Sequence, residues 1–157
     1  MQPSRLIITA VLLAAAAGAA GAQVRPIKET NVMPTTLAEM MAAGRAAAPA
    51  ISYAEARALL DSGKAVAVDV RTEAEVAASG RVAGAIHADR SHLEFKADPQ
   101  SPAYDPAFRK DKVLLVYCAS GGRATLAGKT LAEMGHTQIR NLGGFKDWVA
   151  AGGAVEK

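Results

Sequence analysis

Two short apolar segments place the tightest limits on the fold of this chain. Residues 65–70 read AVAVDV and residues 113–117 read VLLVY, so both runs are rich in β-branched or bulky apolar side chains. Runs of this length and composition predict strands that are buried on both faces, as in a parallel sheet. Shorter apolar stretches at residues 85–87 and 138–142 predict two further strands.

Helix signals lie between these predicted strands. Residues 52–60 begin with the capping-box pattern SYAE and predict a helix that closes near Gly63. Residues 72–78 predict a short helix, and residues 124–134 and 145–151 predict two more. Because helices alternate with strands, we expect an α/β domain with a small, mostly parallel sheet that helices cover on both faces.

Two connections in this pattern carry glycine or proline signals. Residues 89–111 form a long polar connection with three prolines, in which residues 91–96 predict a helical turn. A connection of this length is typical of a loop that rims a functional site. Gly143 and Gly144 predict a turn between the last strand and the last helix.

The first residues have the pattern of a secretory signal. Arg5 is followed by an apolar run over residues 6–17 and by the small-residue triplet at residues 20–22. We therefore predict a signal peptide over residues 1–22, cleavage between Ala22 and Gln23, and an exported, periplasmic protein. An uncleaved membrane anchor is the alternative, but the run is shorter than the ~20 residues that span a bilayer, so no stable anchor is expected.

The rest of the chain divides into a leader and one domain. Residues 23–50 are interpreted as a leader, in which a threonine cap at residues 35–36 predicts a short helix toward Ala47. This helix either packs on the domain or remains exposed. Residues 51–157 are interpreted as the domain.

Composition argues against one class of partner. The chain has 18 Lys and Arg against 15 Asp and Glu, a formal charge of +3, and 4% aromatic residues. A basic binding face and a set of stacking aromatics are the usual features of nucleic-acid binders, so we expect no nucleic-acid partner.

Cys118 is the strongest candidate for a reactive residue. It is the single cysteine of the chain and directly follows the predicted strand at residues 113–117, where ligand sites of α/β sheets form. The loop that follows contains Gly121 and Gly122, and it opens a helix near Arg123. Backbone N–H groups of such a loop and the arginine favour a thiolate. A buried, inert cysteine is the alternative.

The sequence predicts neither a metal site nor a cofactor. His87, His92 and His136 have no metal-ligand spacing with the single cysteine, and we interpret them as surface or structural residues.

Three ordered motifs resemble the rhodanese family and together extend over about residues 51–152. Residues 118–123 (CASGGR) are similar to its active-site loop. Residues 68–71 (VDVR), Glu75 and residues 80–86 are similar to a second signature, although Arg81 and Val82 replace the more common His and Ile. Residues 142–145 together with Trp148 are similar to a third, C-terminal signature of the family.

The resemblance implies an activity and a set of site residues. A rhodanese would be a sulfurtransferase in which Cys118 takes a sulfur atom from a small anionic donor such as thiosulfate and passes it, as a persulfide, to a thiophilic acceptor. Ala119, Ser120, Gly121, Gly122 and Arg123 would bind the persulfide, and Asp69 and Arg71 would support the neighbouring loops. Four residues separate Cys118 from Arg123. Related phosphatases and arsenate reductases have a longer loop, so this spacing favours sulfur transfer.

The resemblance also leaves alternatives. Ala119 and Ser120 stand where relatives that use thiosulfate often carry a basic side chain, and Arg90 or Lys96 could supply that charge instead. The main alternative to an enzyme is a non-catalytic or persulfide-carrier module that binds a protein partner. A protein that accepts sulfur is compatible with both the enzyme and the carrier.

Overall fold

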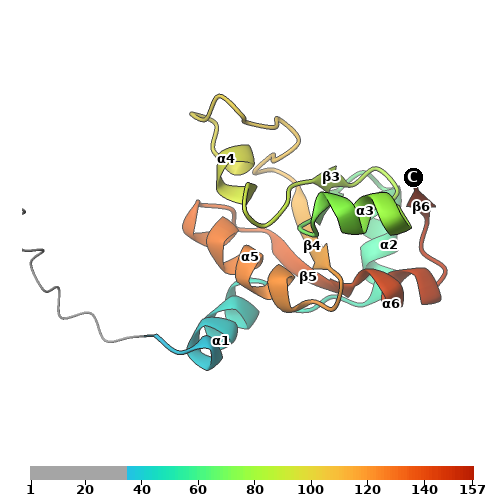
Figure 1. Ribbon diagram of the computed structural model, residues 1–157, viewed down its shortest axis with the longest axis horizontal. Coiled ribbons are helices and arrows are strands. Elements are labelled where there is room, and N and C mark those ends of the chain that lie inside the picture. The colour runs from blue at the N-terminus through green and yellow to red at the C-terminus, as the bar shows by residue number, and fades with distance from the viewer. Residues whose placement is uncertain (1–34) are drawn as a thin grey trace, which may run out of the picture. The chain divides into compact units, whose positions relative to one another are not determined.

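A parallel sheet of four strands, in the order β3-β1-β4-β5, forms the centre of the protein (Figure 1). The strands are β1 (Ala65–Asp69), β3 (Ile86–His87), β4 (Val113–Cys118) and β5 (Ile139–Gly144). Each was predicted from an apolar stretch, and all three pairings in this sheet are parallel. The predicted α/β class with a central parallel sheet is confirmed.

The computed structural model describes residues 35–157. The predicted signal peptide at residues 1–22, its cleavage point and the first part of the predicted leader lie outside the described residues. No helix in the described part of the chain is long and apolar enough to cross a membrane.

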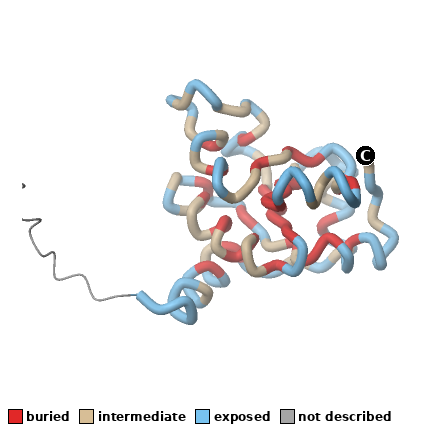
Figure 2. Tube along the Cα trace, in the orientation of Figure 1, coloured by how far each residue is buried: buried red, intermediate tan, exposed pale blue. Residues whose placement is uncertain are grey.

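Helices cover the sheet through two separate apolar clusters. The helices are α1 (Leu37–Ala47), α2 (Tyr53–Asp61), α3 (Glu73–Ser79), α4 (Leu93–Ala97), α5 (Gly122–Glu133) and α6 (Phe145–Ala150). Alternate residues of β4 face opposite sides: Leu114 and Val116 pack with residues of α4 and α5, whereas Leu115 and Tyr117 pack with residues of α2 and α6. Figure 2 shows the buried residues gathered along the strands and on the inner sides of the helices. Alternation on two covered faces explains why the strand is apolar throughout.

Three helices begin with a capping box in which a hydroxyl and a glutamate bond each other's backbone N–H groups. The pairs are Thr36 with Glu39 on α1, Ser52 with Glu55 on α2, and Thr72 with Glu75 on α3. A cap of this kind stabilises a helix by about 1 kcal/mol, so these local signals define where the helices start.

Helix α1 packs on α5 at glycine positions. A Cβ atom at Gly44 would lie 2.5 Å from the backbone oxygen of Thr125, and one at Gly128 would lie 2.3 Å from the Cβ of Ala48. The two backbones therefore approach as closely as they do only because glycine is present. The sequence left open whether this helix packs on the domain or remains exposed. In the structure it packs on the domain.

Two features differ from the sequence predictions. Gly143 and Gly144 belong to β5, where the pairing with β4 shifts register, and do not form a separate turn. Strands β2 (Arg81–Val82) and β6 (Val155–Glu156) form a second, antiparallel pair that was not predicted. Strands of two residues are too short to show a hydrophobic period.

Candidate active site

Cys118 is the last residue of β4, at the carboxyl end of the sheet. Its side chain is buried, with 1% of the residue exposed. The Sγ atom accepts a hydrogen bond from the backbone N–H of Gly121 at 3.1 Å. The loop after β4 therefore turns back on the sulfur and directs an amide dipole at it, which stabilises negative charge on sulfur.

Gly121 shapes this turn and begins α5. Its φ of +89° lies in the left-handed region, where a side chain costs roughly 1–2 kcal/mol. Its carbonyl accepts the first hydrogen bonds of the helix, from the backbone N–H and the hydroxyl of Thr125, both at 3.0 Å. The sulfur consequently lies next to a helix N-terminus, as the sequence predicted.

Asn141 on β5 supports the same turn, and no sequence motif identified it as a site residue. Its Nδ2 donates to the carbonyl of Gly121 at 3.2 Å and to Oγ1 of Thr125 at 2.9 Å. Its Oδ1 accepts from the backbone N–H of Gly143 at 2.8 Å. Nearby, a Cβ atom on Gly144 would lie 2.9 Å from the carbonyl oxygen of Ala119. Strand β5 thus supports the loop through an asparagine and a close glycine contact.

Arg123 forms a two-point ion pair with Glu75 of α3. Its two terminal nitrogens donate to the two carboxylate oxygens at 2.8 and 2.7 Å. These bonds, together with the Thr72 cap, lower the pKa of Glu75 to about 2. The pKa of Arg123 is raised, first by Glu75 and to a smaller extent by Cys118. The guanidinium is thus held on a carboxylate within electrostatic reach of the sulfur, and the sequence did not identify this carboxylate as its partner.

Asp69 and Arg71 form a buried network behind the loop. Arg71 Nε and Nη2 bond the Asp69 carboxylate at 2.9 and 2.6 Å, and Nη2 also donates to the carbonyl of Gly80 at 2.7 Å. Tyr117, the residue before the cysteine, donates its hydroxyl to Asp69 at 2.7 Å. Burial and this carboxylate raise the pKa of Tyr117 well above its usual range. The network connects β1, β4 and the end of α3, and its predicted supporting role remains a prediction.

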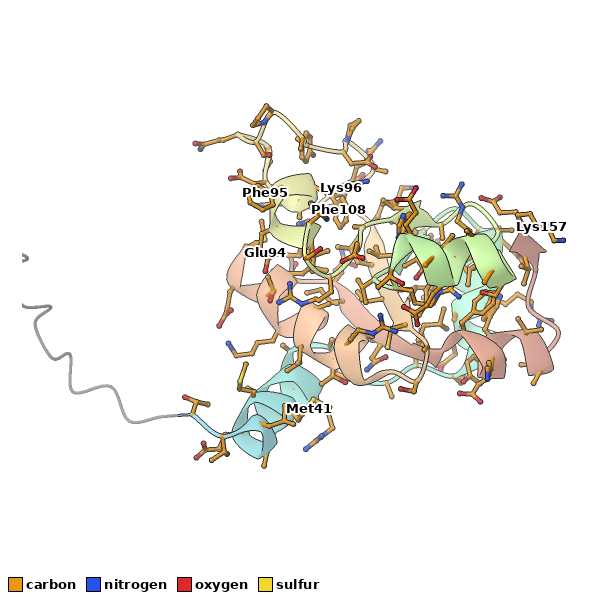
Figure 3. The ribbon with its side chains drawn as sticks, in the orientation of Figure 1. Met41, Glu94, Phe95, Lys96, Phe108 and Lys157 are labelled. Atoms are coloured by element: carbon orange, nitrogen blue, oxygen red, sulfur yellow. The ribbon has the colours of Figure 1, made fainter. Side chains whose placement is uncertain are left out.

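Arg90 and Lys96 are engaged away from the loop. Arg90 bonds Glu94 at 2.9 Å and the hydroxyl of Thr130 at 3.0 Å. Lys96, on α4 (Figure 3), donates to the carbonyl of His87 at 2.8 Å. Neither residue lines the pockets beside the loop. Lys146 of α6, which was not identified from the sequence, is among the residues that line the first of these pockets.

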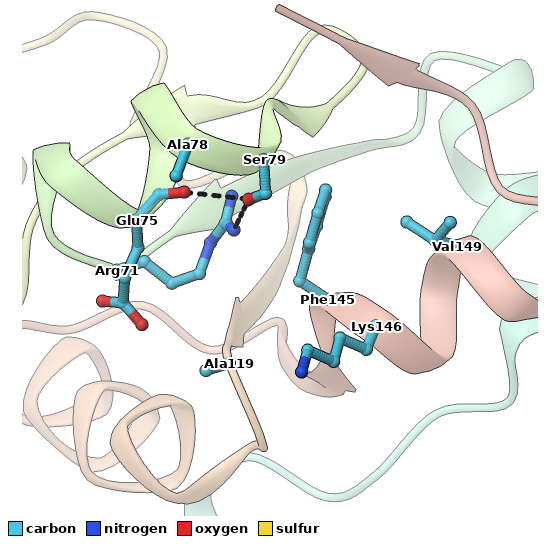
Figure 4. Close-up of a pocket in the computed structure, with 8 residues that line it drawn as sticks. All are labelled: Arg71, Glu75, Ala78, Ser79, Ala119, Phe145, Lys146 and Val149. Atoms are coloured by element: carbon cyan, nitrogen blue, oxygen red, sulfur yellow. Dashed lines mark hydrogen bonds between the residues drawn. The ribbon is translucent and has the colours of Figure 1, made fainter.

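Two pockets flank the loop. The first, of about 500 Å³, lies between α3 and α6 and is lined by Ala119 together with Arg71, Glu75, Ala78, Ser79, Phe145, Lys146 and Val149 (Figure 4). The second, of about 560 Å³, is lined by Ser120, Gly121 and Gly122 together with residues of α1, α2 and β5. The predicted loop residues are therefore divided between two faces, with Ala119 on one and the next three on the other.

The histidines do not gather into a metal site. Within residues 35–157, no group of three or more His, Cys, Asp or Glu side chains is placed to hold a metal ion. His87 bonds the carbonyl of Arg71, and His136 is buried with no partner for either ring nitrogen in that part of the chain. Burial lowers the pKa of His136.

Comparison with known proteins gives one family. A family model described as "Rhodanese-like domain" matches residues 52–151. The human thiosulfate:glutathione sulfurtransferase is 32% identical over 111 residues, which cover 66% of this chain and 96% of the relative.

Two solved structures are similar to this chain over most of its described length. A human single-domain sulfurtransferase superimposes with a TM-score of 0.55 at 32% sequence identity. That match covers 66% of this chain and 96% of the human chain. A protein from Rhodopseudomonas palustris, described as of unknown function and a possible tyrosine phosphatase, gives a TM-score of 0.69 at 37% identity. That match covers 80% of this chain and 100% of the other.

Proposed function

The chain belongs to the rhodanese-like family, and from that premise we propose that it transfers sulfur through a persulfide on Cys118. The relationship to a thiosulfate:glutathione sulfurtransferase supports a sulfurtransferase-type function. The observation that carries the proposal is the sulfur of Cys118 at the carboxyl end of β4, where it accepts the Gly121 N–H at 3.1 Å.

The reaction consists of two sulfur transfers. In the first, the Cys118 thiolate attacks the outer sulfur of thiosulfate, and the bond to the inner sulfur breaks so that sulfite leaves with the electron pair. In the second, an acceptor nucleophile attacks the outer sulfur of the persulfide, and the electron pair of the broken S–S bond returns to Cys118. Amide dipoles of the loop and the nearby Arg123 stabilise the negative sulfur in both steps.

Hydrolysis of phosphate esters is a second candidate, because the Rhodopseudomonas palustris protein is described as a possible tyrosine phosphatase. Four residues separate Cys118 from Arg123, one fewer than in the related phosphatases. In addition, Glu75 occupies both terminal nitrogens of Arg123, which a phosphate would need. These two features favour sulfur transfer.

A carrier or non-catalytic module that binds a protein partner remains the alternative to an enzyme. Such a module would take up sulfur on Cys118 but would deliver it only to that partner, or would take up none. Turnover with a small acceptor distinguishes an enzyme from these modules, because only an enzyme would pass sulfur repeatedly to such an acceptor.

The test is the intact mass of the purified protein after incubation with thiosulfate. We expect a gain of one sulfur atom that reductant removes, and no gain in Cys118→Ser. Thiocyanate formation from thiosulfate and cyanide then tests turnover, and hydrolysis of p-nitrophenyl phosphate tests the phosphatase. The proposal is wrong if no donor adds sulfur to the native protein, or if Cys118→Ser gains it equally.

Export to the periplasm is a further part of this proposal. It rests on the signal pattern of residues 1–22. The mass of the protein recovered from the periplasm should correspond to a chain that starts at Gln23. Recovery of the uncut chain from the cytoplasm alone would refute it.

A further inference from the structure

The carbonyl oxygen of Gly121 accepts more hydrogen bonds than the start of a helix requires. Its donors are the backbone N–H of Thr125 at 3.0 Å, the Thr125 hydroxyl at 3.0 Å and Nδ2 of Asn141 at 3.2 Å. A carbonyl oxygen has two lone pairs, and at the residue that caps a helix it needs only the backbone donor of the first helical turn. The two side-chain donors therefore constrain Gly121 beyond what helix formation needs.

The Asn141 amide group has one orientation that satisfies all its polar atoms. Oδ1 accepts the backbone N–H of Gly143 at 2.8 Å, and Nδ2 donates to the Gly121 carbonyl and to Oγ1 of Thr125. The reverse orientation would bring Oδ1 against the Gly121 carbonyl, so that two acceptors would face each other. The backbone N–H of Asn141 is also bonded, to the carbonyl of Pro49 at 3.0 Å. This side chain is thus a fixed support for the turn.

The Thr125 side chain is fixed between α1 and β5. Thr125 is 4% exposed, and a Cβ atom on Gly44 would lie 2.7 Å from its methyl group, where α1 packs on α5 (Figure 1). With the methyl group against the α1 backbone, the hydroxyl faces Gly121 and Asn141. Helix α1 precedes the residues 52–151 that match the family model, so this chain supports its loop from outside the matched domain.

Gly121 transmits this constraint to the sulfur. Its N–H donates to Sγ of Cys118 at 3.1 Å, while its carbonyl is held by Thr125 and Asn141. The two groups belong to one residue with a φ of +89°, so a rotation that releases the carbonyl also turns the N–H away from the sulfur. A hydrogen bond weakens steeply as it departs from linearity, and a bond to an anion favours the charged form.

We infer that Asn141 and Thr125 are positioning residues that hold the Gly121 N–H on the sulfur of Cys118 and thereby favour the thiolate. The inference rests on the proposed sulfur transfer, in which Cys118 reacts as a thiolate, and adds two residues to the machinery of that reaction. Both act through Gly121. Arg123, paired with Glu75 at 2.7 Å, acts on the sulfur separately and is unchanged in the variants that follow.

The pH profile of Cys118 alkylation tests this inference. Cys118 is the single cysteine of the chain, so the mass gained from iodoacetamide at a series of pH values reports its thiolate. In Thr125→Val and in Asn141→Ala we expect the midpoint to rise by about one pH unit, with about 10-fold slower alkylation below it. Thr125→Ser retains the hydroxyl and should restore the native midpoint.

Thr130→Val is the matched control. Thr130 also lies on α5, but its hydroxyl accepts a bond from Arg90 at 3.0 Å and is not part of the turn. This variant loses the same hydroxyl from the same helix and should leave the alkylation midpoint unchanged. An equal shift in Thr130→Val would show that general loosening of α5 controls the sulfur, and would overturn the inference.

Each variant gives a separate outcome. A native midpoint in Thr125→Val or in Asn141→Ala overturns the role of that residue, and a shift in Thr125→Ser as large as in Thr125→Val overturns the role of the hydroxyl. Circular dichroism identifies a variant that fails to fold. Asn141 is half-buried, so Asn141→Ala leaves the core intact and provides the test even if Thr125→Val does not fold.

The alkylation assay also separates this inference from the proposed function, because it requires no sulfur donor. The mass of the same samples after thiosulfate treatment reports sulfur uptake independently. Shifted midpoints without uptake by the native protein would count against the sulfurtransferase proposal alone. Uptake by the native protein with unshifted midpoints in the variants would count against the positioning residues alone.

Discussion

Glu75→Gln removes the negative charge that holds Arg123 and retains the shape of the side chain. The pKa of Glu75 is lowered from 4.5 to about 2, mainly by the Arg123 bonds. At 1.36 kcal/mol per unit, such a shift corresponds to about 3 kcal/mol of stability. The Glu75 side chain is 35% exposed, so solvent screening reduces the expected contribution to about 1 kcal/mol. We expect Glu75→Gln to lower the free energy of unfolding by about this amount at pH 7.

The pH dependence of this loss follows from the direction of the shift. Because the folded pKa of Glu75 lies below the ordinary value, the stabilisation is complete above about pH 4.5 and is lost as the pH falls toward 2. The difference between the native protein and Glu75→Gln should therefore shrink as the pH is lowered below 4.5. Urea unfolding at a series of pH values measures it.

Glu55→Gln is the matched control. Glu55 forms the same capping box on α2, with Ser52, but no arginine in residues 35–157 bonds its carboxylate. Glutamine retains part of a capping box, so the control measures the cost of that change alone. If Glu75→Gln destabilises the protein no more than Glu55→Gln does, or if the difference is the same at every pH, the reasoning about the ion pair is wrong.

Three further changes test the loop, the docked helix and the buried network. Gly121→Ala must adopt a φ of +89°, so it should cost about 1–2 kcal/mol in urea unfolding and slow sulfur uptake by mass; unchanged uptake would contradict the assigned turn. Gly44→Val should destabilise by about 1–3 kcal/mol, because a Cβ there lies 2.5 Å from a backbone oxygen of α5, whereas the exposed Ala43→Val should change stability much less. Tyr117→Phe removes one of the donors to the buried Asp69 and leaves the buried Val82 N–H without its hydroxyl acceptor, so it should lower the free energy of unfolding by about 1–3 kcal/mol; a neutral effect would show that the Tyr117 hydroxyl is dispensable.

The strands and the helix starts were predictable from local patterns. The apolar runs at residues 65–70 and 113–117 became β1 and β4, because a strand covered on both faces needs apolar side chains at most of its positions. Ser52 begins α2 and Thr72 begins α3, because each capping box is completed within a single helical turn. Such features depend only on neighbours in the chain.

Contacts between distant segments were not predictable in the same way. Asn141 reaches the loop because β5 lies beside β4, and Glu75 reaches Arg123 because α3 lies beside the start of α5. Arg90 and Lys96 were candidates for the missing positive charge, and their partners on other elements hold them elsewhere. Pairings of this kind depend on how the chain crosses the sheet, which no local pattern records.

The sequence by itself determined the α/β class, the strand that ends at Cys118 and the glycine turn that follows it, since short-range preferences of apolar runs, caps and glycine are enough for these. Only the tertiary structure decided that α1 docks on α5, that Arg123 is paired with Glu75, and that Lys146 lines the first pocket together with Ala119 of the loop. The physical reason is that these ion pairs and close contacts join segments far apart in the chain. They form only when those segments have packed together.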